Sequence, residues 1–192
     1  MTSPEQQGGP DPVRWTRSTV YSDMWVDPEN DPRETGAAPA DERSTLLDYL
    51  RRYRLTLEMK CADLTAEQLA SRSVPPSTMS LLGLVRHLTE VERHWFRRGL
   101  AGQDAESLYC LADRDGDWNG ALPDPEVVDE AWRRWRQEVA FAEQVAEGLV
   151  DLGARPAGVP VRDVLVHMVE EYARHCGHAD LLRERIDGRV GQ

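Results

Sequence analysis

The histidines of this chain gather in two segments, residues 80–100 and residues 161–186. Near the middle of the second segment, Glu171 and His175 stand four residues apart. On a helix this spacing projects both side chains from one face about a turn apart, which suits two ligands of one metal ion. His87 in the first segment is the third candidate, because metal sites in helix bundles combine inward-facing groups from different helices. The pattern therefore predicts a divalent-metal site made of His87, Glu171 and His175.

The inward stripe of the second segment is apolar at both ends and polar in the middle. At about 100° per residue its members fall within one sector of a helix. Burying a carboxylate and imidazoles without partners would cost several kcal/mol, so we expect something to compensate them. The members of the stripe are Val161, Val164, Met168, Glu171, His175, His178 and Leu182.

Spacing alone leaves other interpretations of these three residues open. A single buried histidine such as His87 is more often a hydrogen-bonded core or boundary residue than a ligand. Glu171 could instead form an ion pair with Arg86 or Arg174. His175 is the strongest single candidate, because it lies in the middle of the stripe.

The remaining histidines differ in their place on the helical pattern. His178 shares the stripe, so it could be a fourth ligand, a hydrogen-bond partner of a ligand, or a contact for substrate. His94 and His167 lie nearer the flanks of their helices and are expected to have surface or boundary roles.

Four long amphipathic helices are predicted to position these side chains. The first begins at Glu42, where an apolar residue recurs every three or four positions. The second covers residues 80–100 and is expected to be capped by Ser77 or Thr78. The third begins at Pro125 behind the cap Asp124, and the fourth follows Pro160. Because no strand pattern is present, the fold class is all-α, a four-helix bundle.

Residues 1–40 form a separate unit in this interpretation. They are rich in Pro, Gly, Asp and Glu and have no sustained periodicity, so we expect an extended N-terminal arm before a bundle domain at residues 41–190. The arm nevertheless contains large side chains, which indicates packing onto the domain or a partner subunit. These side chains are Trp15, Tyr21, Met24 and Trp25.

Composition excludes several classes of function. The formal net charge of −11 argues against nucleic acid as a partner. No apolar run reaches the roughly 20 residues that span a bilayer, and the polar start is not a signal peptide. Three cysteines are too few for a disulfide framework, so reduced thiols and a cytoplasmic location are expected.

Two segments carry a family resemblance. LLGLVRHLTEVERHWFRR and VRDVLVHMVEEYARHCGHADLLRERIDG resemble the DinB-like superfamily, especially the actinobacterial branch that includes mycothiol-dependent maleylpyruvate isomerase and mycothiol transferases. The resemblance covers about Glu42 to Gly188 and leaves out the arm. It implies a four-helix bundle, often dimeric, with a metal triad from the second and last helices.

The resemblance also implies which residues form that triad. The family's second-helix histidine falls on His87, and its ligand pair four residues apart falls on Glu171 and His175. Many members have histidine at the position of Glu171, but the isomerase branch is similar to this chain in using glutamate. His178 stands where other members often have glutamine.

These residues together predict a metal-dependent thiol transferase or isomerase. Three protein ligands leave coordination positions open, and a divalent ion lowers the pKa of a bound thiol or water. The resemblance implies mycothiol as the thiol, acting on a small electrophilic molecule, and we expect zinc, with nickel as the alternative metal, and a homodimer. A non-catalytic, stress-related protein that binds metal or a small ligand is the alternative. Metal-assisted hydrolysis is less favoured, because Glu170, the nearest candidate base, points away from the stripe.

Overall fold

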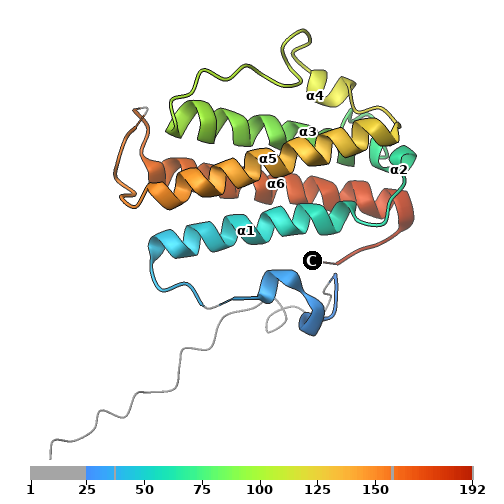
Figure 1. The fold of residues 1–192 in the computed structure, drawn as a ribbon. Coiled ribbons are helices and arrows are strands. Elements are labelled where there is room, and N and C mark those ends of the chain that lie inside the picture. Colours follow the sequence, from blue (N-terminus) through green and yellow to red (C-terminus); the bar gives the residue numbers. More distant parts are fainter. Residues whose placement is uncertain (1–24, 37, 157, 192) are drawn as a thin grey trace, which may run out of the picture.

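Four long helices packed side by side form the body of the protein in the computed structural model (Figure 1), which describes residues 25–36, 38–156 and 158–191. No strand occurs in these ranges, so the predicted all-α bundle is confirmed. None of the described helices combines the length and apolar character needed to cross a membrane. The long helices are α1 (Glu42–Cys61), α3 (Leu81–Glu92), α5 (Pro125–Gly148) and α6 (Val161–Asp187). The shorter ones are η2 (Pro28–Asn30), η3 (Pro32–Glu34), α2 (Ala66–Ala70), η4 (Arg93–Leu100) and α4 (Gly116–Asn119).

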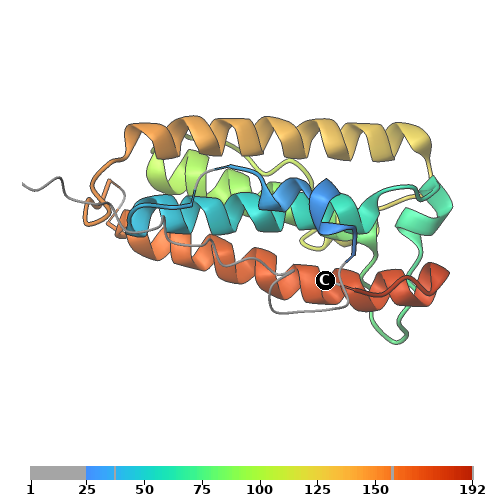
Figure 2. The same ribbon diagram turned by 90° about the horizontal axis from the view of Figure 1, so that it is seen from below.

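The arrangement of the helices brings the histidine-bearing segments together. Helix α1 packs along α6, and α3 packs against both α5 and α6. Figure 2 shows α5 and α6 on opposite sides of the bundle, with α1 and α3 between them. Leu84 and Leu88 of α3 are fully buried, and so is Met168 of α6, as its place in the apolar stripe predicts. The π-helix η4 continues α3 without a break.

Capping side chains explain where most of the long helices begin. Asp41 accepts a hydrogen bond from the Ser44 amide at 2.7 Å, and Asp124 accepts one from the Glu126 amide at 2.9 Å. Pro125 occupies the first turn of α5, where its missing N–H has no cost. The predicted starts of these two helices are therefore confirmed.

The predicted cap of α3 is wrong. Ser80, not Ser77 or Thr78, has the extended backbone of a cap, and its Oγ accepts from the Gly83 amide at 3.0 Å. Ser77 is already used in the preceding loop, where its Oγ accepts from the Met79 amide at 3.2 Å. The helix begins at Leu81, one residue after the predicted start at residue 80.

A buried polar network joins the four long helices. Arg54 of α1 donates two hydrogen bonds of 2.8 Å to the carboxylate of Glu92 at the end of α3. The Tyr172 hydroxyl of α6 donates to the same carboxylate at 2.8 Å and accepts from the Trp135 indole of α5 at 2.9 Å. Burial alone would lower the pKa of Arg54, but the Glu92 carboxylate raises it above its ordinary value. Helical periodicity did not predict these buried charges.

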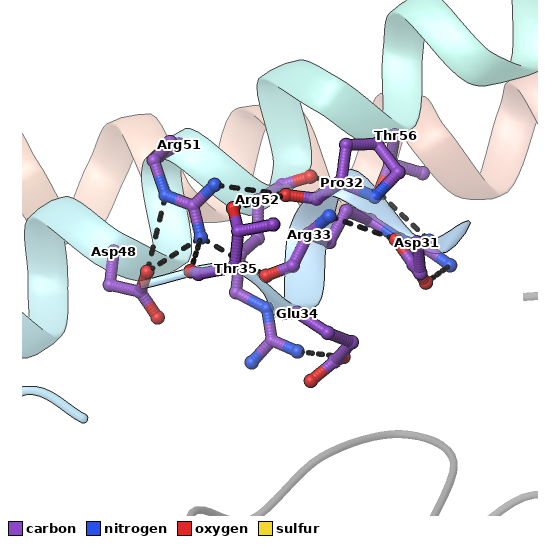
Figure 3. A network of polar contacts seen from close by, with 9 residues as sticks. All are labelled: Asp31, Pro32, Arg33, Glu34, Thr35, Asp48, Arg51, Arg52 and Thr56. Atoms are coloured by element: carbon purple, nitrogen blue, oxygen red, sulfur yellow. Dashed lines mark hydrogen bonds and ion pairs between the residues drawn. The ribbon is translucent and has the colours of Figure 1, made fainter. Parts of the chain in front are cut away.

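The described part of the N-terminal segment packs onto α1 (Figure 3). Arg33 and Asp31 form a fully buried ion pair of 2.7 Å, and Arg33 also donates to the Thr56 hydroxyl at 3.2 Å. From α1, Arg51 donates to the backbone carbonyls of residues 32, 33 and 35 at 3.3, 3.0 and 3.3 Å. Backbone groups that lack a helical partner are satisfied in this way.

Trp25 anchors the beginning of this segment. It is 6% exposed, and Lys60 Nζ and the Arg189 guanidinium each lie 3.9 Å from the centre of its ring. The predicted packing of the arm onto the domain therefore holds for Trp25, while the domain boundary at residue 40 stays a prediction. The other large side chains of the arm lie outside the described residues: Trp15, Tyr21 and Met24.

We predict that Glu92→Gln lowers the free energy of unfolding by about 3–5 kcal/mol, because it leaves the buried charge of Arg54 without its counter-ion. Urea denaturation followed by circular dichroism measures this loss. Glu143→Gln is the matched control, since that carboxylate is 56% exposed and lies 3.7 Å from Arg54. It should cost less than about 1 kcal/mol. Equal effects of the two substitutions would contradict the role given to Glu92.

Candidate metal centre

The packing of α3 against α6 brings together the three residues predicted as ligands. His87, Glu171 and His175 each offer one ligand atom, and these atoms lie within 4.8 Å of one another. Their side chains are 27%, 24% and 10% exposed, respectively. The triad therefore has a buried base against the bundle and an open side toward solvent.

The ring of His87 is held on two sides by a segment far away in sequence. Its Nδ1 lies 2.9 Å from Oδ2 of Asp117 in α4. Its ring stacks on Trp118 with the centroids 5.0 Å apart and the planes inclined by 25°. Because a carboxylate accepts, this hydrogen bond assigns the proton to Nδ1 and leaves the lone pair of Nε2 for a metal ion.

Asp117 is the site residue that sequence reasoning missed. The carboxylate is nearly buried, and its second oxygen accepts from the Trp118 amide at 3.0 Å. Residues 103–123 are rich in acidic and turn-forming residues, and no periodicity predicts that a turn in them reaches α3. The available signal was His87 itself, since a ligating imidazole needs an acceptor for its other nitrogen.

The carboxylate of Glu171 lies between two imidazoles of its own helix. Its Oε2 is 3.3 Å from His175 Nε2, and its Oε1 is 3.5 Å from His167 Nε2. The alternative partners are engaged elsewhere: Arg174 pairs with Glu170 at 3.1 Å, and Arg86 donates to backbone carbonyls. Among the described residues, Glu171 makes no ion pair with an arginine.

His175 is the most buried member of the triad. Burial, followed by the nearby His87 and His178 side chains, lowers the pKa of His175 to about 4. Its imidazole is therefore neutral near pH 7, which is the form that binds a metal ion. The neutral ring has one nitrogen toward Glu171 and the other toward His178.

His178 lies beside the triad and outside its cluster of ligand atoms. Its Nδ1 is 3.3 Å from Nδ1 of His175, so one ring can donate to the other. The group of mutually close ligand atoms among the described residues does not include His178. This placement matches a hydrogen-bond partner of a ligand better than a fourth ligand.

The two other histidines differ in their distance from the triad. His94 is exposed, as expected. His167 is half-buried beside Glu171, and its ring lies 4.8 Å from that of Trp95 in η4. His167 is thus closer to the candidate centre than its flanking place on the helix predicted.

The donor set fits a divalent first-row metal ion. Two imidazole nitrogens and one carboxylate oxygen are a common combination for zinc, and nickel accepts the same donors. The three donors come from two helices whose packing fixes their separation, and the open side leaves room for further ligands. This is the arrangement of catalytic rather than structural metal sites.

The comparison with protein families gives an independent result. The family model described as Mycothiol-S-transferase matches residues 45–188, which includes α3, α6 and the whole triad. No curated protein and no solved structure gives a match. The family is DinB-like, in agreement with the helical bundle described above. Since the match covers most of the chain, this protein belongs to the mycothiol S-transferase family.

Proposed function

We propose that this chain is a metal-dependent mycothiol S-transferase that acts on a small electrophilic molecule. Membership of the family implies the transferase activity and mycothiol as the cosubstrate. The observation that carries the metal dependence is the convergence of His87, Glu171 and His175, whose ligand atoms lie within 4.8 Å of one another. Zinc as the metal and the homodimer remain predictions of the sequence.

Each residue of the triad has a definite part in this proposal. His87 offers Nε2 because Asp117 occupies its other nitrogen. His175 offers a neutral imidazole, and Glu171 offers a carboxylate oxygen. A divalent metal ion held there lowers the pKa of a thiol or water that binds to it, which supplies a nucleophile near neutral pH.

The charge of the triad suits an anionic ligand such as a thiolate. Two neutral imidazoles and one carboxylate cancel one of the two charges of a divalent cation, so an anionic ligand such as a thiolate is favoured. Hydrolysis would also need a general base. Glu170, the nearest carboxylate in sequence, is 60% exposed and pairs with Arg174, so it does not face the triad.

The alternative, a non-catalytic protein that binds metal or a small ligand, is less well supported. A structural metal site is usually closed by four protein ligands. Here the triad is open on one side, and His178 contacts His175 from outside the cluster. This open side favours an enzyme.

We predict that the purified protein binds about one equivalent of zinc and that His175→Ala weakens binding more than about 100-fold, since it removes one of three ligands. Metal analysis after dialysis and competition with a fluorescent chelator measure both quantities. His94→Ala is the control, because His94 is an exposed histidine of the same chain. A His175→Ala variant that retained a full equivalent would disprove the triad.

We predict that the zinc-loaded protein joins mycothiol to electrophiles such as alkyl halides or α,β-unsaturated carbonyl compounds. With a halide, a carbon–sulfur bond forms, the halide leaves and the thiol proton is released; with an unsaturated carbonyl compound, sulfur and hydrogen add across the double bond. Mass spectrometry of the adducts measures turnover, with glutathione as the comparison thiol and His175→Ala as the control protein. If mycothiol did not bind and no electrophile of the panel were turned over, the proposed function would be overturned.

A further inference from the structure

Arg86 precedes the candidate ligand His87 on α3, yet its side chain is directed to another part of the chain. Its Nε donates to the carbonyl of Asp117 at 2.9 Å, and its Nη2 donates to the carbonyl of Gly116 at 2.9 Å. Arg86 is buried, so these hydrogen bonds are shielded from water. Asp117, which orients His87, is therefore itself held at its backbone carbonyl by Arg86.

The guanidinium of Arg86 is confined from two further directions. Its central carbon lies 3.8 Å from the centre of the Tyr109 ring, an arrangement that stabilises an arginine over an aromatic face. The Glu130 carboxylate of α5 lies 3.9 Å from Nη1. Three parts of the chain (α3, the connection that contains Tyr109 and Asp117, and α5) thus meet at one side chain that takes no direct part in the triad.

The segment that carries Asp117 is shaped to approach Arg86 closely. A Cβ added to Gly120 would lie 2.4 Å from Arg86 Nη2, and one added to Gly116 would lie 2.1 Å from the Tyr109 carbonyl oxygen. A Cβ at Gly120 would also lie 2.8 Å from the Gly116 carbonyl oxygen, so backbone atoms exclude a side chain at both positions. The close approach is a specific feature of this segment.

A second residue of α3 holds the start of the same segment. Oε1 of Glu90 accepts hydrogen bonds from the Ser107 hydroxyl and the Leu108 amide at 2.7 Å, and from the Tyr109 amide at 2.5 Å. Glu90 lies four residues after Arg86, so both side chains project from neighbouring positions on one face of α3. The part of the connection that these two side chains hold, residues 107–117, therefore has little freedom to shift.

We propose that Arg86 is a positioning residue for the metal centre. It holds Asp117 so that the Asp117 carboxylate meets Nδ1 of His87 and directs Nε2 of His87 toward the metal ion. The proposal rests on the proposed function only in taking the triad as the metal site. Lysine cannot replace Arg86 here, because a single ammonium group lacks the planar fork that reaches two carbonyls at once.

The test compares zinc affinity of the full-length protein and its Arg86→Lys variant by chelator competition. Loss of an outer hydrogen-bonding partner typically weakens metal binding about 10- to 100-fold, and we expect that range for Arg86→Lys and for Asp117→Asn. Because the two residues act in series, the double variant should bind zinc no more weakly than the weaker single variant.

Arg93→Lys is the matched control. Arg93 follows α3 directly and also holds this connection, donating to the Glu106 carbonyl at 2.6 Å, but it does not contact Asp117. It also pairs with Glu138 at 2.8 Å. Its substitution should leave zinc affinity within about twofold of wild type. Equal losses for Arg86→Lys and Arg93→Lys, or additive losses in the double variant, would overturn the proposal.

A measurement without metal separates this proposal from the proposed function. Long-range ¹H–¹⁵N NMR spectra of the metal-free protein report which nitrogen of His87 carries the proton. We expect the proton on Nδ1 in wild type and a mixture of both tautomers in Arg86→Lys. An unchanged tautomer would overturn the proposal even if the triad binds zinc. Absence of zinc binding in wild type would overturn the triad as a metal site, whereas the tautomer shift would still show that Arg86 orients His87.

If the Arg86→Lys variant does not fold, the same two measurements are made on Tyr109→Leu. It removes the ring beneath the guanidinium but leaves Arg86 and its two hydrogen bonds in place. We expect a smaller loss of zinc affinity in the same direction, with the same shift of the His87 tautomer. No change in either quantity would count against Arg86.

Discussion

The hydrogen bond from Tyr172 to Glu92 sets the register between α3 and α6, on which the triad depends. It is 2.8 Å long and fully buried, and the same carboxylate holds Arg54 of α1. Tyr172 follows Glu171 directly, so adjacent residues of α6 face the core and the candidate metal centre. A carboxylate buried with a charged partner and a hydroxyl tolerates little displacement, because each lost partner would leave a polar group unsatisfied. Sliding of α6 along α3 that misplaced Glu171 would therefore also break this network.

The sequence predicted the parts of this structure that follow from local periodicity. The four long helices, the Asp124 cap and the pairing of Glu171 with His175 all depend on residues close together in the chain. His87 can join this pair only if α3 and α6 are neighbours, and the family resemblance implied that they are. The buried network was missed because charged residues such as Arg54 and Glu92 are normally solvated, and periodicity does not reveal two that neutralise each other.

The connection between α3 and α5 shows a different limit of sequence reasoning. Residues 103–123 are polar and turn-prone, which is typical of a solvated loop. Their path is decided by contacts with residues 17 to 31 positions away, chiefly Glu90 and Arg86. Such contacts leave no period in the sequence, so neither the short helix α4 nor the role of Asp117 was predictable. The sign of this path that the sequence does contain is the pair Gly116 and Gly120, because the close approach of other atoms at these positions requires glycine.

Helix α3 therefore contributes at once to the core, to the buried polar network and to the candidate metal centre. The core face of α3 contains Leu84 and Leu88, and its end places Glu92 in the buried network. His87 points toward α6, while Arg86 and Glu90 hold the connection that orients it. We therefore expect a substitution on any of these faces to displace His87 in the candidate metal centre, either by moving the helix or by releasing Asp117. The candidate triad is thus held by residues that are themselves fixed by hydrogen bonds and packing, which is what a preformed site on two helices requires.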